Sequence, residues 1–166
     1  IVQDEVHYFD KNYFLPLRWY RNHFVRSDGS LLNGEATPVY MSKKSAIDRI
    51  RVHYPDVKLI VFLREPIQRA FSKWNRVRQR NDAARVATKP FVRSVLDNDR
   101  KLLTNGLYAE HLEYILKRFP RENLHIAISE RVLDRPAQEY ERISRFLDLA
   151  PFDFGASERR HSTTYK

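Results

Sequence analysis

Five consecutive apolar residues, Leu59–Leu63, are the feature that most constrains the fold of this chain. A run of this length without alternation predicts a strand buried on both faces, as in a parallel sheet. Pro66 follows almost at once, and its missing N–H costs nothing in the first turn of a helix. Apolar residues then recur at the spacing of one helix face, at Ile67, Ala70, Phe71, Trp74 and Val77. The pattern predicts a strand that passes directly into a helix.

Two polar residues occupy informative places in this predicted unit. Arg64 lies at the carboxyl end of the strand, and Ser72 lies about two turns into the helix. In open α/β sheets that edge is where ligands bind. An arginine there offers a forked donor that matches phosphate. The alternative is an arginine paired with a neighbouring carboxylate and a serine that is merely solvated.

Charge and composition narrow the classes of partner. The 166 residues carry a formal net charge of +9, which favours an anionic partner such as a nucleotide, a nucleic acid, an acidic glycan or a membrane surface. The chain has no cysteine, which excludes disulfides and thiolate metal sites. Its histidines lack the spacing of metal ligands. No apolar run approaches the roughly 20 residues of a membrane span.

The rest of the chain alternates predicted strands and helices. Besides the central strand, strands are expected at Val6–Phe9, Glu35–Met41 and Leu124–Ile128. Helices are expected at 14–24, after a cap at Ser42, from Pro66 to Asp82, at Phe91–Leu96, over 107–119 and after Pro136. This order predicts a single α/β domain over 1–166, with a parallel sheet and right-handed crossovers. The sequence has no glycine-rich phosphate loop, and we expect the chain to begin after that element.

The segment Lys58–Trp74 resembles the 3′-phosphate-binding motif of the sulfotransferases that use 3′-phosphoadenosine 5′-phosphosulfate (PAPS). In that family the strand-end arginine and the helix serine contact the 3′-phosphate, which implies these roles for Arg64 and Ser72. The resemblance implies a three-layer parallel sheet flanked by helices, as in P-loop nucleotide kinases. The first strand and the phosphate loop of that fold would be missing from this chain.

Three further segments carry the resemblance. Glu5–Asp10 resembles the segment before the substrate cleft in glycan sulfotransferases of the heparan-sulfate type, which implies Glu5 as catalytic base and His7 as its support. In a strand these two residues would share a face. Gly106–Glu110 resembles a segment near the adenine, which implies a cofactor role for Tyr108, although core packing is the alternative. Arg159 and Arg160 resemble the basic loop that closes over the cofactor phosphates, with a solvated tail as the alternative.

The chain also departs from the glycan enzymes. Ala36 stands where they often have a lysine that helps to bind substrate or the sulfuryl group. The pair of cysteines common near the C-terminus of the animal enzymes is absent. Both departures favour a bacterial-type, cytoplasmic enzyme.

The resemblance implies transfer of a sulfuryl group from PAPS to a hydroxyl or amine of a glycan or small-metabolite acceptor, with 3′,5′-ADP as product and no metal. Two alternatives remain, an ATP-dependent kinase of related fold and a non-catalytic basic module that binds polyanions. The basic run Lys73–Arg80 carries its charges on the solvated side of the predicted helix, which disfavours nucleic-acid binding. The sequence indicates neither the acceptor nor the oligomeric state.

Overall fold

The computed structural model describes residues 5–24, 32–84, 87–97 and 100–150, apart from the side chains of 100 and 101. The chain divides into two compact units, which we describe separately. The first comprises Ile1–Val57 and Glu110–Asn123, and the second comprises Lys58–Ala109 and Leu124–Lys166. The expectation of one domain stays a prediction.

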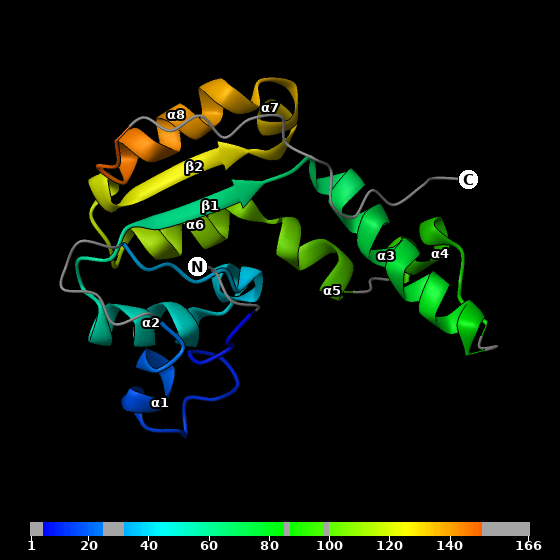
Figure 1. Ribbon diagram of the computed structural model, residues 1–166. Coiled ribbons are helices and arrows are strands. Elements are labelled where there is room, and N and C mark those ends of the chain that lie inside the picture. Colours follow the sequence, from blue (N-terminus) through cyan, green and yellow to red (C-terminus); the bar gives the residue numbers. More distant parts are fainter. Residues whose placement is uncertain (1–4, 25–31, 85–86, 98–99, 151–166) are drawn as a thin grey trace. The chain divides into compact units, whose positions relative to one another are not determined.

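The second unit contains a two-stranded parallel sheet. Strands β1 (Leu59–Leu63) and β2 (Leu124–Ile128) pair in register from Leu59 opposite Leu124 to Leu63 opposite Ile128, and their arrows point the same way in Figure 1. Both strands and their parallel pairing confirm the sequence prediction. Burial of β1 on both faces was wrong, because Val61 is 8% exposed whereas Phe62 is 54% exposed. Within the described residues β1 pairs with β2 alone.

Helix α3 (Pro66–Ala83) follows β1 as predicted, and its start is fixed by local chemistry. Pro66 occupies the first turn, and the Glu65 carboxylate accepts hydrogen bonds from the backbone N–H groups of Ile67 (3.0 Å) and Gln68 (2.6 Å). A carboxylate in this place satisfies backbone donors that have no partner inside the helix. The direction in which the chain leaves the sheet is therefore set immediately after Arg64.

The second unit also contains several shorter helices and a 3-10 turn. They are α4 (Phe91–Leu96), α5 (Arg100–Leu103), the 3-10 turn η2 (Thr104–Gly106), α7 (Ser129–Asp134) and α8 (Pro136–Phe146). Helices α7 and α8 pack on each other and on β2 (Figure 1). The sequence predicted α4 and the start of α8, but it did not predict α5 or α7.

The first unit is helical and aromatic. It contains α1 (Leu17–Arg21), the 3-10 helix η1 (Pro38–Ser42), α2 (Lys44–His53), most of α6 (Tyr108–Leu116) and the 3-10 turn η3 (Arg121–Asn123). The helix expected over 14–24 is confined to α1, because a residue before proline disfavours the helical conformation and Pro16 precedes α1. Ser42 is not the cap of α2, since Lys43 holds that position and the Ser42 hydroxyl donates to Val39 O.

The two strands predicted for this unit do not form. Residues 35–37 are irregular, and Pro38 starts η1 instead of extending a strand. Val6–Phe9 enters a turn in which the backbone N–H groups of Lys11 and Asn12 both donate to the His7 carbonyl. The rings of Tyr8 and Phe9 pack on Tyr20, with ring centres 4.8 and 5.0 Å away. Burial of this aromatic cluster takes the place of strand pairing.

Candidate functional site

The carboxyl edge of the sheet presents Arg64, which directly follows β1. Its backbone carbonyl accepts a 2.9 Å hydrogen bond from the Tyr108 hydroxyl at the start of α6. Ser72 is the seventh residue of α3 and is partly exposed. The structure therefore uses Tyr108 to fix the backbone that carries Arg64, while its predicted contact with a cofactor stays a prediction.

Glu130 also lies at this edge, and sequence reasoning missed it. It belongs to the first turn of α7, directly after β2, and its Oε1 accepts the backbone N–H of Glu65 at 2.9 Å. That hydrogen bond lowers the pKa of Glu130, and the Arg64 guanidinium lowers it further. The available signal was the pairing of the strands, because two parallel strands bring the residues after their carboxyl ends to one edge. Arg64 thus has an anionic neighbour at this edge of the sheet.

Gly106 allows the segment before α6 to pack closely on the first turns of α3. A Cβ atom at Gly106 would lie 3.4 Å from Arg69 Nη2 and 3.4 Å from Pro66 Cβ. The Arg69 guanidinium also donates to the Leu102 carbonyl. These contacts tie the segment that carries Tyr108 to the helix that carries Ser72.

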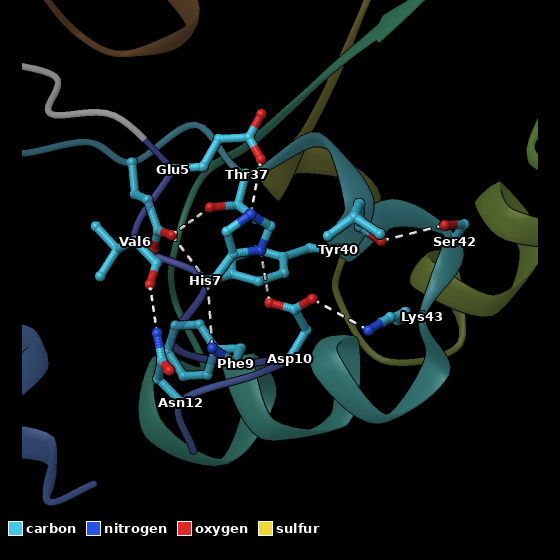
Figure 2. A network of polar contacts seen from close by, with 12 residues as sticks. Glu5, Val6, His7, Phe9, Asp10, Asn12, Thr37, Tyr40, Ser42 and Lys43 are labelled. Carbon is cyan, nitrogen blue, oxygen red and sulfur yellow. Dashed lines mark hydrogen bonds and ion pairs between the residues drawn. The ribbon is translucent and has the colours of Figure 1, made fainter. Parts of the chain in front are cut away.

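A second cluster, in the first unit, contains the predicted base. Figure 2 shows the imidazole of His7 between the carboxylates of Glu5 and Asp10. The distances are 2.9 Å from His7 Nε2 to Glu5 Oε2 and 2.9 Å from His7 Nδ1 to Asp10 Oδ1. The strand that was expected to place Glu5 and His7 on one face is absent. They meet because the chain turns at His7, whose φ of 54° lies in the left-handed region.

Asp10 and Lys43 extend the cluster, and the sequence analysis did not single out either of them. Asp10 Oδ2 lies 3.1 Å from Lys43 Nζ, and the Asp10 side chain is only 1% exposed. Burial alone would raise the pKa of Asp10, but the hydrogen bonds from Lys43 and His7 outweigh burial and lower this pKa. The His7–Asp10 spacing of three residues was the one local signal for this contact.

The contacts of His7 bridge two carboxylates. Each ring nitrogen lies 2.9 Å from a carboxylate oxygen, one of Glu5 and one of Asp10. Glu5 is 51% exposed at its side chain, whereas His7 is 20% exposed. The cluster therefore presents one carboxylate to solvent and holds it from behind.

A partly buried carboxylate, that of Glu35, anchors the turn that carries this cluster. Its oxygens accept hydrogen bonds from Tyr20 (2.7 Å), Thr37 (2.6 Å) and Tyr40 (2.8 Å). The Tyr40 hydroxyl in turn accepts the backbone N–H of Phe9 at 3.1 Å. Burial and the Glu35 carboxylate raise the pKa of both Tyr20 and Tyr40, so these hydroxyls remain donors. Phe9 lies between His7 and Asp10, and this network therefore fixes their backbone.

The buried state of Asp10 predicts a dependence of stability on pH. Its pKa is lower in the folded chain than in the unfolded chain, so its contribution is complete above the ordinary value of about 4. That contribution disappears as the pH falls through the lower folded value. In urea unfolding measured between about pH 6 and pH 3, the Asp10→Asn variant should lose less free energy of unfolding than the unmodified chain. Parallel losses in the two proteins would contradict this expectation.

Not every predicted site residue falls within the description. Arg159 and Arg160 lie outside the described residues. Arg64, Ser72 and Tyr108 belong to the second unit, whereas Glu5 and His7 belong to the first. In the described part of the chain, no group of three or more His, Cys, Asp or Glu side chains has an arrangement that would hold a metal ion. Its helices include none with the length and apolar character of a membrane span.

A parallel strand pair with helices packed on it, and an arginine directly after the carboxyl end of one strand, defines an α/β protein. The model of the sulfotransferase domain family matches residues 3–162. The chain belongs to the sulfotransferase family.

Named relatives agree with this assignment. Human heparan sulfate glucosamine 3-O-sulfotransferase 3B1 is 33% identical over 152 residues, which cover 89% of this chain and 39% of the relative. Mouse heparan sulfate glucosamine 3-O-sulfotransferase 5 is 29% identical over 159 residues, covering 90% of this chain and 46% of the relative. The chain thus spans less than half the length of these relatives.

The fold is shared with solved structures. A sulfotransferase from Alicyclobacillus acidocaldarius superposes with a TM-score of 0.77 at 21% identity, covering 97% of this chain and 75% of that one. The sulfotransferase domain from the curacin biosynthetic pathway gives a TM-score of 0.55 at 17% identity, with 76% and 41% covered. These similarities establish an α/β sulfotransferase fold for the chain.

Proposed function

We propose that this chain is the base-bearing and nucleotide-binding part of a PAPS-dependent sulfotransferase. The observation that carries the proposal is the Glu5 carboxylate, half exposed and bonded from behind by His7, in a chain of the sulfotransferase family. A base of this kind is what an acceptor hydroxyl or amine needs in order to attack sulfur.

The proposed reaction is an in-line displacement at the sulfur of PAPS. The acceptor oxygen or nitrogen forms a bond to sulfur while the bond from sulfur to the 5′-phosphate oxygen breaks. Glu5 accepts the proton that the acceptor loses, and 3′,5′-ADP leaves with the electron pair of the broken bond. By analogy with phosphoryl transfer, the protein mainly positions the groups and stabilises charge.

Arg64 and Ser72 are proposed to hold the 3′-phosphate of the nucleotide. Support comes from the position of Arg64 at the open carboxyl edge of the sheet and from the guanidinium fork, which suits phosphate oxygens. Tyr108 serves this site by fixing the Arg64 carbonyl. Arg159 and Arg160 are proposed to contribute to the phosphate site. We also propose that the fold resembles that of P-loop nucleotide kinases.

The acceptor is proposed to be a glycan or a small metabolite that bears a hydroxyl or an amine. The two relatives described above are named for heparan sulfate glucosamine, and Ala36 in place of a lysine sets this chain apart from the usual glycan pattern. A cytoplasmic location stays a prediction.

Calorimetric titration of 3′,5′-ADP into the full-length protein tests the proposal, with 5′-AMP and ATP as comparison ligands. We expect 3′,5′-ADP to bind at least tenfold more tightly than 5′-AMP, a difference of about 1.4 kcal/mol. Equal binding of the two nucleotides would overturn the PAPS site. Binding of ATP alone would favour the kinase alternative, and binding that follows charge and salt without preference for any nucleotide would favour the polyanion module.

A further inference from the structure

Lys43 closes the far end of the cluster that begins at Glu5. It is the residue before α2, and its Nζ lies 3.1 Å from Asp10 Oδ2 (Figure 2). Its side chain is 42% exposed, whereas that of Asp10 is 1% exposed. The side chains of Glu5, His7, Asp10 and Lys43 thus form a line of contacts. The two ends, the Glu5 carboxylate and the Lys43 ammonium, are more exposed than His7 and Asp10 between them.

The middle of this line depends on Lys43. Asp10 uses Oδ1 for His7 and Oδ2 for Lys43, so each carboxylate oxygen is committed to one partner. A carboxylate removed from water is stable only when it is paired and hydrogen-bonded. Without the Lys43 ammonium, Asp10 Oδ2 would lack this hydrogen-bond donor. Rotation of the Asp10 carboxyl group toward another donor would then weaken its hydrogen bond with His7 Nδ1.

Glu5, at the other end of this line, is the candidate base, and its orientation depends on His7. Glu5 is 51% exposed, so its side chain has many accessible rotamers unless a contact selects one. Its described partner is His7 Nε2, and the ring can hold Glu5 in place only while its other nitrogen is fixed. A misplacement of about 1 Å in such a group can cost on the order of a hundredfold in rate.

We propose that Lys43 is a positioning residue of the candidate base: acting through Asp10 and His7, it fixes the orientation of the Glu5 carboxylate. This inference rests on the proposed function, in which Glu5 accepts the proton of the acceptor. Lys43 touches neither the acceptor nor the nucleotide in this scheme. It acts by keeping Asp10 ionised and still.

The test is proton NMR of the His7 ring in the full-length protein. A proton held between His7 Nδ1 and Asp10 is protected from exchange with water and gives a downfield N–H signal, which a His7→Gln variant assigns by its loss. We expect Lys43→Met to broaden or abolish this signal and Lys43→Arg to restore it, because arginine also donates to a carboxylate. An unchanged His7 signal in Lys43→Met would overturn the proposal.

Lys44→Met is the matched control. Lys44 is adjacent, carries the same charge, and lies with its Nζ over the Tyr114 ring, 5.1 Å from the ring centre, rather than on Asp10. Its replacement should leave the His7 signal unchanged. Equal loss of the signal in both variants would assign the effect to net charge or to stability and would overturn the proposal, and thermal unfolding of each variant identifies a stability effect.

A kinetic measurement tests whether the position of the His7 ring affects the rate of sulfuryl transfer. With ³⁵S-labelled PAPS as donor and heparan sulfate as acceptor probe, Lys43→Met should lower kcat about ten- to a hundredfold and leave the KM for PAPS unchanged. A wild-type protein that fails to prefer 3′,5′-ADP over 5′-AMP in calorimetry would refute the proposed function. The NMR comparison would still decide whether Lys43 positions His7, so the two failures are distinguishable.

Discussion

The Glu5→Gln variant is expected to lose sulfuryl transfer by roughly 10²- to 10⁴-fold in kcat, the range for removal of a positioned general base. Glutamine has nearly the same size and can still contact His7 Nε2, which lies 2.9 Å from Glu5 Oε2 in the native chain. It cannot accept the proton that the attacking group must lose. The expected loss is therefore in the chemical step rather than in folding or nucleotide binding.

Three measurements separate these possibilities for Glu5→Gln. Calorimetry should give an unchanged affinity for 3′,5′-ADP, and thermal unfolding should change little because Glu5 is half exposed. The matched control is Glu122→Gln, since Glu122 is exposed on η3 and lies outside the cluster. Full activity of Glu5→Gln with any acceptor that the native enzyme sulfates would show that the base is another group.

The Arg64→Ala variant is expected to lose about ten- to a hundredfold in affinity for 3′,5′-ADP. This corresponds to the roughly 1.5–3 kcal/mol carried by hydrogen bonds to charged groups. The loss should be selective, because the affinity for 5′-AMP, which lacks the 3′-phosphate, should stay the same. The affinity of Arg64→Lys for 3′,5′-ADP should lie between those of the native chain and Arg64→Ala, since lysine keeps the positive charge but lacks the forked guanidinium.

The position of Glu130 makes a control necessary for Arg64. The Arg64 guanidinium helps to lower the pKa of Glu130, so its removal also changes the charge balance at the edge of the sheet. Arg76→Ala removes a cation from an exposed position of α3 and should leave both nucleotide affinities unchanged. Equal weakening of 3′,5′-ADP and 5′-AMP binding by Arg64→Ala would assign Arg64 to the general field of the site instead of the 3′-phosphate.

Local sequence determined the sheet-edge part of the candidate site. Leu59–Leu63 form β1 and Pro66 starts α3, so Arg64 stands between a strand and a helix whose start is fixed by the adjacent Glu65 and Pro66. Such features follow from strand burial and helix-start chemistry within one short segment. The same reasoning predicted Leu124–Ile128 as a strand, and the pairing of β2 with β1 confirmed it.

The prediction failed where aromatic packing overruled the local pattern. Val6–Phe9 has the apolar character of a short strand, yet Tyr8 and Phe9 pack on Tyr20 in a turn. Glu35–Met41 does not form the predicted strand, because Pro38 starts η1 and the Glu35 carboxylate accepts hydrogen bonds from three hydroxyl groups. The strand propensity of a residue mainly reflects how well its side chain packs on neighbouring strands. In this unit the neighbours are aromatic rings instead of strands.

Adjacent residues in the sequence were enough to predict the strand–Arg–helix unit, and the resemblance of short segments indicated the sulfotransferase family and Glu5 as the candidate base. Folding was needed to show that Glu130 holds the backbone beside Arg64 from 65 residues away and that Lys43 pairs with Asp10 across 33 residues. Neither partner carries a local signal, since a charged residue at a helix start is ordinary in any soluble protein. Lys43 is needed because folding removes the Asp10 carboxylate from water, and Glu130 is needed because the backbone N–H of Glu65 requires an acceptor. Both requirements arise only in the folded chain.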